Sequence, residues 1–325
     1  MLKLVCTRWL SIGRYLERLL QNWEPMKMFF KSEFDDIKKK SVSSSGQFAE
    51  SSDKPYAHKK VENILKFLKS PTNKLYVLFL GYIVKIDDDV LVSLQSDEPK
   101  IHVLTKMLVN MNMKVLCRFV KPAAMSSCVP EVVDFKSSYN LKDNKDLVIG
   151  DAACSFIADS DHNGLNDMWI KQFYGDVKLY FKSVCSYLIE KLPLKEPILR
   201  HAIVADASLQ QTAKSSDLIF FLHRFPALRP PGCIIDTVVA QFAIYQYTDL
   251  STCTRQRMDE TWAAVGKYEE GALFLSELSV IMQGIVAIPP SNAHCERIFS
   301  TVCKNRTEQR LSMGDDTLEA LLLIK

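Results

Sequence analysis

The chain is dominated by amphipathic helical patterns that short breakers separate. In many segments, apolar residues recur at the i, i+3, i+4, i+7 spacing that places them on one face of a helix. The clearest runs lie within residues 16–23, 61–68, 101–111, 165–188 and 262–285. Only 11 of the 325 residues are glycine, so few positions favour leaving the helical conformation. We therefore predict a mainly α fold, arranged as a multi-helix bundle.

Prolines and a serine-rich stretch divide these helices. Pro25 should kink or break the first of them. Residues 38–54 begin with three lysines and continue as a serine-rich run, which predicts an exposed loop. The sequence Arg-Pro-Pro-Gly at residues 229–232 is the clearest breaker after that loop. We place a domain boundary there, between residues 1–230 and residues 231–325.

Three apolar segments need more than periodicity to be assigned. Residues 234–247 are apolar and β-branched enough for a strand, but the helical pattern around them favours a helix. Residues 259–285 are predicted to form one long helix, capped by Asp259. Residues 75–84 are the most hydrophobic run. They are about half as long as the roughly 20 residues that a membrane span needs, so we predict a buried core helix.

Composition narrows the class of protein. Hydrophobic residues make up 47% of the chain, which is enough to bury a large core in one or two domains. The 41 basic and 38 acidic residues leave a net charge of +3. This balance does not indicate a strongly basic nucleic-acid binder, although it allows a local basic face. The nine cysteines are scattered without a Cys-x-x-Cys pair, which indicates reduced thiols in a nuclear or cytosolic protein and not a secreted one.

Two acidic segments resemble metal sites only in part. Residues 87–89 are three consecutive aspartates, but neighbours on a helix point about 100° apart and cannot converge on one ion. Residues 159–167 match the start of an EF-hand loop, yet Ile170 stands where the loop needs a bidentate glutamate. We expect a solvated turn or helix end at the first segment. At the second we expect a turn that caps the following helix.

Near the C-terminus, a breaker, a cap and an apolar stripe follow one another. Pro289 and Pro290 end the preceding helix, and Ser291 stands where an N-cap oxygen should accept from a free backbone amide. The apolar positions that follow share one helical face: Cys295, Ile298, Phe299 and Val302. Glu296 lies beside this face, in the first turns of the helix, where the helix dipole favours a carboxylate.

This segment also resembles the C-terminal signature of hAT-superfamily transposases. The residues that carry the resemblance are Ser291, Ala293, Glu296, Arg297, Phe299, Ser300, Arg310, Leu311, Leu318, Leu321 and Leu322. Residues 7–11, Thr-Arg-Trp-Leu-Ser, resemble the Arg-Trp motif that opens the helical insertion of the family. Two motifs in the family's order, about 280 residues apart, are more specific than either motif alone.

The resemblance implies a fold and a set of interaction residues. The chain would comprise the family's helical insertion and the C-terminal helices of an incomplete RNase H-like domain. The dimerisation residues that it implies are Ala293, Arg297, Phe299, Leu318, Leu321 and Leu322. Trp9 matches the tryptophan that the family places against a flipped base, and Arg8 precedes it. The alternative is a core position for Trp9 at the mouth of a helix, and we favour it if the nuclease is incomplete.

The resemblance also implies that catalytic residues are missing. The family's nuclease holds two divalent metals with two aspartates and one glutamate, and Glu296 matches the glutamate. Both aspartates precede the Arg-Trp motif, which begins here at residue 7. We therefore expect a chain truncated before that motif and catalytically incomplete, with no cofactor. Magnesium or manganese would bind only if a longer product supplied the aspartates.

The sequence and its resemblance to the family favour one function and leave two alternatives. The favoured function is that of a nuclear, transposase-derived protein that acts by homo-oligomerisation, with no membrane or small-molecule partner. One alternative is a fragment of an active DNA transposase. The other is a weak DNA-binding module that uses Trp9, Arg8, Arg14 and Arg18. Helices that normally pack on the missing sheet would expose apolar surface, so we expect an obligate oligomer or a poorly soluble chain.

Overall fold

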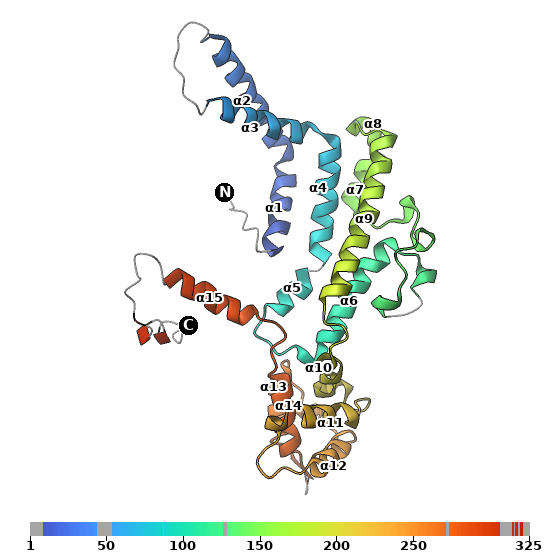
Figure 1. Ribbon diagram of the computed structural model, residues 1–325, viewed down its shortest axis with the longest axis vertical. Helices are drawn as coiled ribbons and strands as arrows, with labels where there is room; N and C mark the ends of the chain where they lie inside the picture. Colours follow the sequence, from blue (N-terminus) through green and yellow to red (C-terminus); the bar gives the residue numbers. More distant parts are fainter. Residues whose placement is uncertain are drawn as a thin grey trace. The chain divides into compact units, whose positions relative to one another are not determined.

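The computed structural model is dominated by helices and divides into two compact units (Figure 1). The described residues are 9–43, 54–86, 88–125, 129–270, 273–305, 314, 316–317 and 319–320. Unit 1 comprises residues 1–89 and 112–188, and unit 2 comprises residues 90–111 and 189–325. The mainly α, multi-helix fold is confirmed. The RNase H-like relationship and the domain boundary near residue 230 stay predictions.

The elements follow in chain order. Unit 1 contains α1 (Trp9–Gln21), α2 (Trp23–Ser43), α3 (Lys54–Lys69), α4 (Pro71–Ile83), α7 (Asp151–Ala158), α8 (Ser160–Asn163) and most of α9 (Asp167–Lys191). Unit 2 contains α10 (Pro197–His201), α11 (Ser215–Arg224), α12 (Ile235–Tyr245), α13 (Met258–Val265), β1 (Glu269–Glu270), β2 (Leu273–Phe274), α14 (Ser276–Val286) and α15 (Ala293–Asn305). Both units share α5 (Asp88–Leu94) and α6 (Ile101–Phe119).

Short 3₁₀ helices connect many of these elements. They are η1 (Val84–Ile86), η2 (Pro122–Ala124), η3 (Pro130–Val132), η4 (Ser138–Asn140), η5 (Asn144–Asp146), η6 (Ala202–Ala205), η7 (Ala207–Leu209), η8 (Pro226–Leu228) and η9 (Ser251–Cys253). Several begin at a proline, whose fixed φ suits the first position of a helical turn. These 3₁₀ helices therefore start where the sequence places a proline.

Aromatic packing forms the centre of unit 1. Phe173 and Phe181 of α9 are buried, and Phe119 stacks on Phe181 with ring centroids 5.3 Å apart. Phe79 of α4 meets the edges of both α9 rings, at 5.9 and 5.8 Å. The apolar stripe predicted within residues 165–188 is confirmed as core at Leu165, Phe173, Val177, Phe181 and Leu188. Its other members are half-buried, apart from Met168, which is 68% exposed. The run at residues 75–84 is confirmed as a core helix, α4, with its last residue in η1.

The N-terminal helices of unit 1 follow the predicted break but not the predicted loop. The first helix ends at Gln21, and Pro25 lies in the first turn of α2, where a proline removes no helical hydrogen bond. The indole of Trp23 is buried and donates to the carbonyl of Leu68, at 3.1 Å. The loop predicted from Lys38 is wrong over its first residues, because α2 continues to Ser43. Residues 44–53 lie outside the described part of the chain.

Trp262 lies at the centre of unit 2. It is fully buried in α13, its indole donates to the carbonyl of Ala205 at 2.8 Å, and its ring lies 5.1 Å from that of Tyr245. Residues 235–245 form α12, so the choice of helix over strand is confirmed.

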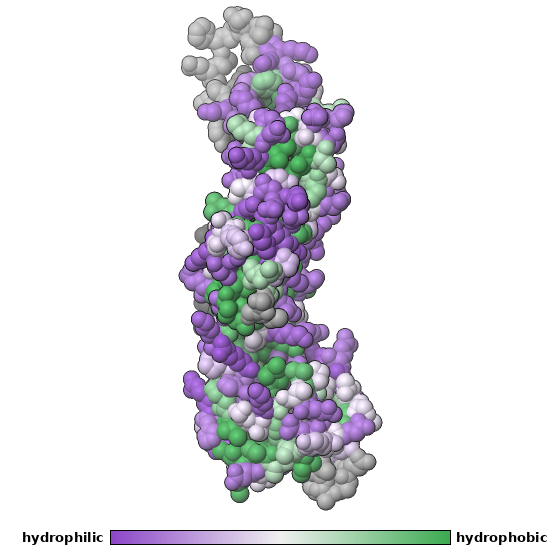
Figure 2. All heavy atoms as spheres, turned by 90° about the vertical axis from the view of Figure 1, so that its right-hand side faces the viewer, coloured by the Kyte–Doolittle hydropathy of each residue, from purple (hydrophilic) through white to green (hydrophobic). Residues whose placement is uncertain are grey.

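On the side drawn in Figure 2, hydrophilic side chains separate the hydrophobic ones into patches.

The single long helix predicted for residues 259–285 is wrong. The chain instead forms α13, an antiparallel pair of two-residue strands, and α14. Gly266 ends α13, and α14 packs so close that a Cβ atom on Gly266 would lie 2.6 Å from Oγ of Ser279. The glycine therefore allows the two helices to lie side by side (Figure 1). Hydrophobic periodicity alone does not predict this turn, because the segments on both sides of it, α13 and α14, each have an apolar helical face.

The acidic segments behave as ordinary helix ends and turns. Asp88 and Asp89 begin α5. In the EF-hand-like stretch, Gly164 takes a left-handed conformation with φ of 70°, and Oδ1 of Asn166 accepts from the amide of Trp169 at 2.8 Å. The prediction that this turn caps the next helix is confirmed. Among the described residues, no group of three His, Cys, Asp or Glu side chains is placed to hold a metal ion.

A pair of glycine substitutions tests the close packing of α13 on α14. We expect Gly266→Ala to lower the free energy of unfolding by about 1–3 kcal/mol, because the new methyl group overlaps Ser279. Gly175→Ala in α9 meets no atom within 4 Å. It should stabilise the protein by roughly 0.5–1 kcal/mol through helix propensity. Urea denaturation followed by circular dichroism measures both, and equal effects of the two variants would contradict the packing.

Candidate interaction surface

The base of α15 is fixed by a serine that makes two hydrogen bonds. Ser291 Oγ accepts from the amide of Ala293 at 3.3 Å, so the predicted hydrogen bond to a free amide is present. The N-cap position itself belongs to Asn292, whose carbonyl accepts the first bond within the helix, from the amide of Glu296 at 3.0 Å. The Ser291 hydroxyl also donates to the carbonyl of Leu94 at 2.7 Å. Both partners belong to unit 2. The serine therefore joins the start of α15 to a segment that lies 197 residues earlier.

Arg297 makes a second anchor, one turn further along α15. Its guanidinium donates to the carbonyl of Gln95 at 2.5 Å and to the carboxylate of Asp97. The Arg297 and Asp97 side chains are 47% and 74% exposed. An ion pair this exposed contributes only about 0–1 kcal/mol to stability. Its main consequence is geometric, because it holds one side of α15 against residues 95–97.

The opposite side of α15 is apolar and largely exposed. With about 100° of rotation per residue, five side chains cluster on the side away from Arg297. These residues, Cys295, Ile298, Phe299, Val302 and Cys303, form what we term the apolar face of α15. Phe299 is 67% exposed and Ile298 is 39% exposed. Both cysteines are free and exposed. The predicted apolar stripe is thus present, and the described part of the chain leaves much of it uncovered.

A shallow pocket lies beside this anchor. It has a volume of about 420 Å³ and is lined by residues 96–99, residues 286–291 and Ala293. The carboxylate of Glu98 in its wall is hydrogen-bonded to Lys100, which lowers the pKa of that carboxyl. The lining combines prolines and aliphatic side chains with two serines and two carboxylates, of which Asp97 is already paired with Arg297. The pocket is therefore part of the joint between α14 and α15, with little chemistry of its own.

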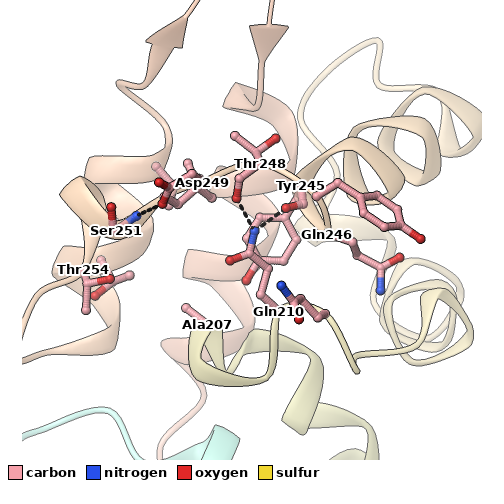
Figure 3. A pocket seen from close by; sticks show the side chains of 13 residues that line it. Ala207, Gln210, Tyr245, Gln246, Thr248, Asp249, Ser251 and Thr254 are labelled. Carbon is pink, nitrogen blue, oxygen red and sulfur yellow. Dashed lines mark hydrogen bonds between the residues drawn. The ribbon is translucent and has the colours of Figure 1, made fainter.

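A second pocket in unit 2 is polar but does not assemble catalytic groups (Figure 3). It has a volume of about 390 Å³. The Gln210 amide in it donates to the carbonyls of Tyr245 and Thr248, so the backbone occupies this donor. Burial raises the pKa of the Tyr245 hydroxyl. Among the described residues that line the pocket, Asp249 is the one carboxylate and there is no histidine or cysteine.

The remaining predicted site residues are spread over the chain. Glu296 is exposed on α15. Its catalytic assignment stays a prediction. Trp9 is the first residue of α1 in unit 1, and Arg8 lies outside the described residues. The predicted dimerisation residues Leu318, Leu321 and Leu322 also lie outside them.

Sequence reasoning missed part of this surface. Gln95 and Asp97 contact Arg297 across about 200 positions, and nothing in the local pattern indicates that pairing. The sequence alone could have placed Cys303 on the apolar face, because it extends the helical spacing that begins at Cys295. The anchor could be found only from the structure, whereas the full extent of the apolar face could be found from the sequence.

Comparison with known proteins identifies the C-terminal quarter of the chain. Residues 252–325 match the hAT family C-terminal dimerisation region. No curated protein and no solved structure matches the chain. The predicted resemblance to the C-terminal portion of an hAT-family transposase is thereby confirmed. The match supports a transposase-derived protein that contains a region for homo-oligomerisation. In the described part of the chain, no helix has both the length and the hydrophobicity to cross a bilayer.

Removing the Ser291 hydroxyl tests the anchor. In Ser291→Ala, the amide of Ala293 loses its acceptor and the Leu94 carbonyl loses a donor. A lost hydrogen bond costs about 1 kcal/mol, so the first-turn amides of α15 should exchange about fivefold faster. Hydrogen exchange with mass spectrometry measures this rate. Ser276→Ala, at the start of α14, is the matched control and should leave α15 unchanged. An unchanged rate in Ser291→Ala would show that the hydroxyl does not hold the helix.

Proposed function

Because the C-terminal portion of the chain carries the hAT family's dimerisation region, we propose that this protein acts by binding a second copy of itself through the apolar face of α15. One observation carries the proposal. Phe299 is 67% exposed on a helix whose opposite side is anchored by Arg297. Within the described part of the chain, the anchor leaves the apolar side uncovered.

The energetics favour burial of this face. Covering an exposed phenylalanine side chain contributes roughly 1.5–3 kcal/mol, and a symmetric dimer gains this twice. A stable interface buries about 800 Å² on each partner, which is more than one short helix provides. The apolar face of α15 would therefore be the centre of a larger contact. The predicted residues Leu318, Leu321 and Leu322 would extend it, since they belong to the same matched region.

The proposal includes catalytic incompleteness and a nuclear location. Two-metal phosphoryl transfer needs several carboxylates around a pair of ions. Glu296 stands on an exposed helix surface, and the described residues offer no group of three potential metal ligands. The nuclear location is inferred from the family alone. In this proposal the protein acts by pairing with a second copy of itself and not by cutting DNA.

The oligomeric state tests the interface directly. Light scattering coupled to size exclusion should give a dimer mass for the wild-type chain. Phe299→Asp should shift it towards the monomer at micromolar concentration, because a carboxylate would be buried without a partner. Lys304→Asp places the same group on the exposed side away from the apolar face. It should remain dimeric. A monomeric wild type, or a dimer that Phe299→Asp leaves intact, would contradict the proposal.

Catalytic incompleteness has a separate test. We expect the purified chain to leave supercoiled DNA uncut in the presence of Mn²⁺, and Glu296→Gln to behave identically. Gel analysis of plasmid nicking over several hours measures the activity. Metal-dependent nicking that disappears in Glu296→Gln would overturn this part of the proposal. It would leave dimerisation unaffected.

A further inference from the structure

The cysteines on α15 define how two copies of this helix can pair. We infer that α15 packs antiparallel against α15 of a second copy, centred on Phe299, so that Cys295 of one copy lies beside Cys303 of the other. This inference rests on the proposed dimerisation and specifies its geometry. It concerns the orientation of the partner, which the family match does not give.

The two cysteines of the apolar face are placed symmetrically about Phe299. Cys295 and Cys303 lie four residues before and after it, which is about 6 Å along the helix axis in each direction. Rotating one helix by 180° about an axis through Phe299 therefore exchanges the two cysteine positions. An antiparallel pair brings Cys295 against Cys303 of the second copy at both ends. A parallel pair would bring each cysteine against its own counterpart.

Charge favours the antiparallel arrangement. The helix ends carry partial charges of about +0.5 at the N-terminus and −0.5 at the C-terminus. Antiparallel pairing places ends of opposite sign beside each other. Parallel pairing would place like ends together at both positions.

Side-chain size fits the same geometry. Phe299 is the one large ring on the apolar face, and the thiols beside it behave as small apolar groups. Two facing Phe299 rings can therefore lie side by side, with the cysteines leaving room at either end. Ile298 and Val302 would fill the neighbouring row of the same face. The contact becomes self-complementary, as a two-fold interface requires.

Disulfide trapping tests this geometry in the full-length chain. The background carries serine at the cysteines that are not buried or not described: Cys6, Cys117, Cys128, Cys154 and Cys233. Cys295→Ser and Cys303→Ser are then made separately, with tags of different mass, and are also co-expressed. Copper-phenanthroline accepts the two electrons while each pair of thiols loses two protons and forms one disulfide. Products are separated on a non-reducing gel.

We expect a cross-linked dimer only when the two variants are combined. In an antiparallel pair, two Cys295 residues would lie about 12 Å apart along the axis. This exceeds the roughly 7 Å between Cα atoms that a disulfide tolerates, so each variant alone should stay uncross-linked. The combined sample should give one product with the summed mass of the two tagged chains.

The other outcomes separate this inference from the proposed function. Cross-linking of each variant with itself would establish a parallel pair and overturn the antiparallel geometry, while keeping the dimer. A dimer by light scattering that no combination cross-links would place the interface away from the apolar face of α15. A monomer by light scattering would mean that no second copy covers the apolar face of α15. The proposed function would then fail together with the inference.

Discussion

The polar anchor under α15 is the constraint on which this account of the protein depends. A helix of 13 residues is marginal by itself in water, so its position must come from tertiary contacts. Ser291 and Arg297 supply these contacts, and both bind backbone carbonyls in the segment from Leu94 to Gln95. Because all of these bonds lie on the polar side, they leave the apolar side uncovered by the residues that the structure describes. An apolar helix face of this kind is a common basis for protein association.

Both halves of the anchor start from one core. Leu94, which supplies one of the anchoring carbonyls, and Ile288, which precedes the two prolines, both pack against the buried centre of unit 2. Trp262 and the close pairing of α13 with α14 hold that centre together. The family match begins within this unit, at residue 252. The dimerisation region therefore includes part of the core that positions its exposed helix, and residues 94–97 support it from outside the matched segment.

Sequence patterns predicted elements whose information is local. The apolar run of α4, the aromatic stripe of α9 and the hydrogen bond between Ser291 and the start of α15 could be predicted, because each depends on neighbours within a few positions. The prediction of one continuous helix over residues 259–285 failed because the turn at Gly266 depends on packing against Ser279. The partners of Arg297 could not be predicted for the same reason, since they are brought close only by folding. Surface exposure of Phe299 likewise needed the structure, because an apolar stripe alone predicts burial.

The central claim is that a second copy covers the apolar face of α15. Hydrogen exchange of peptides spanning residues 295–303, measured over a range of protein concentrations, tests it most directly. The account predicts that these amides become more protected as concentration rises, while peptides from the buried part of α9 around Phe173 do not change. Protection of residues 295–303 that stays constant across the range in which the chain changes from monomer to dimer would place the interface elsewhere and contradict the account.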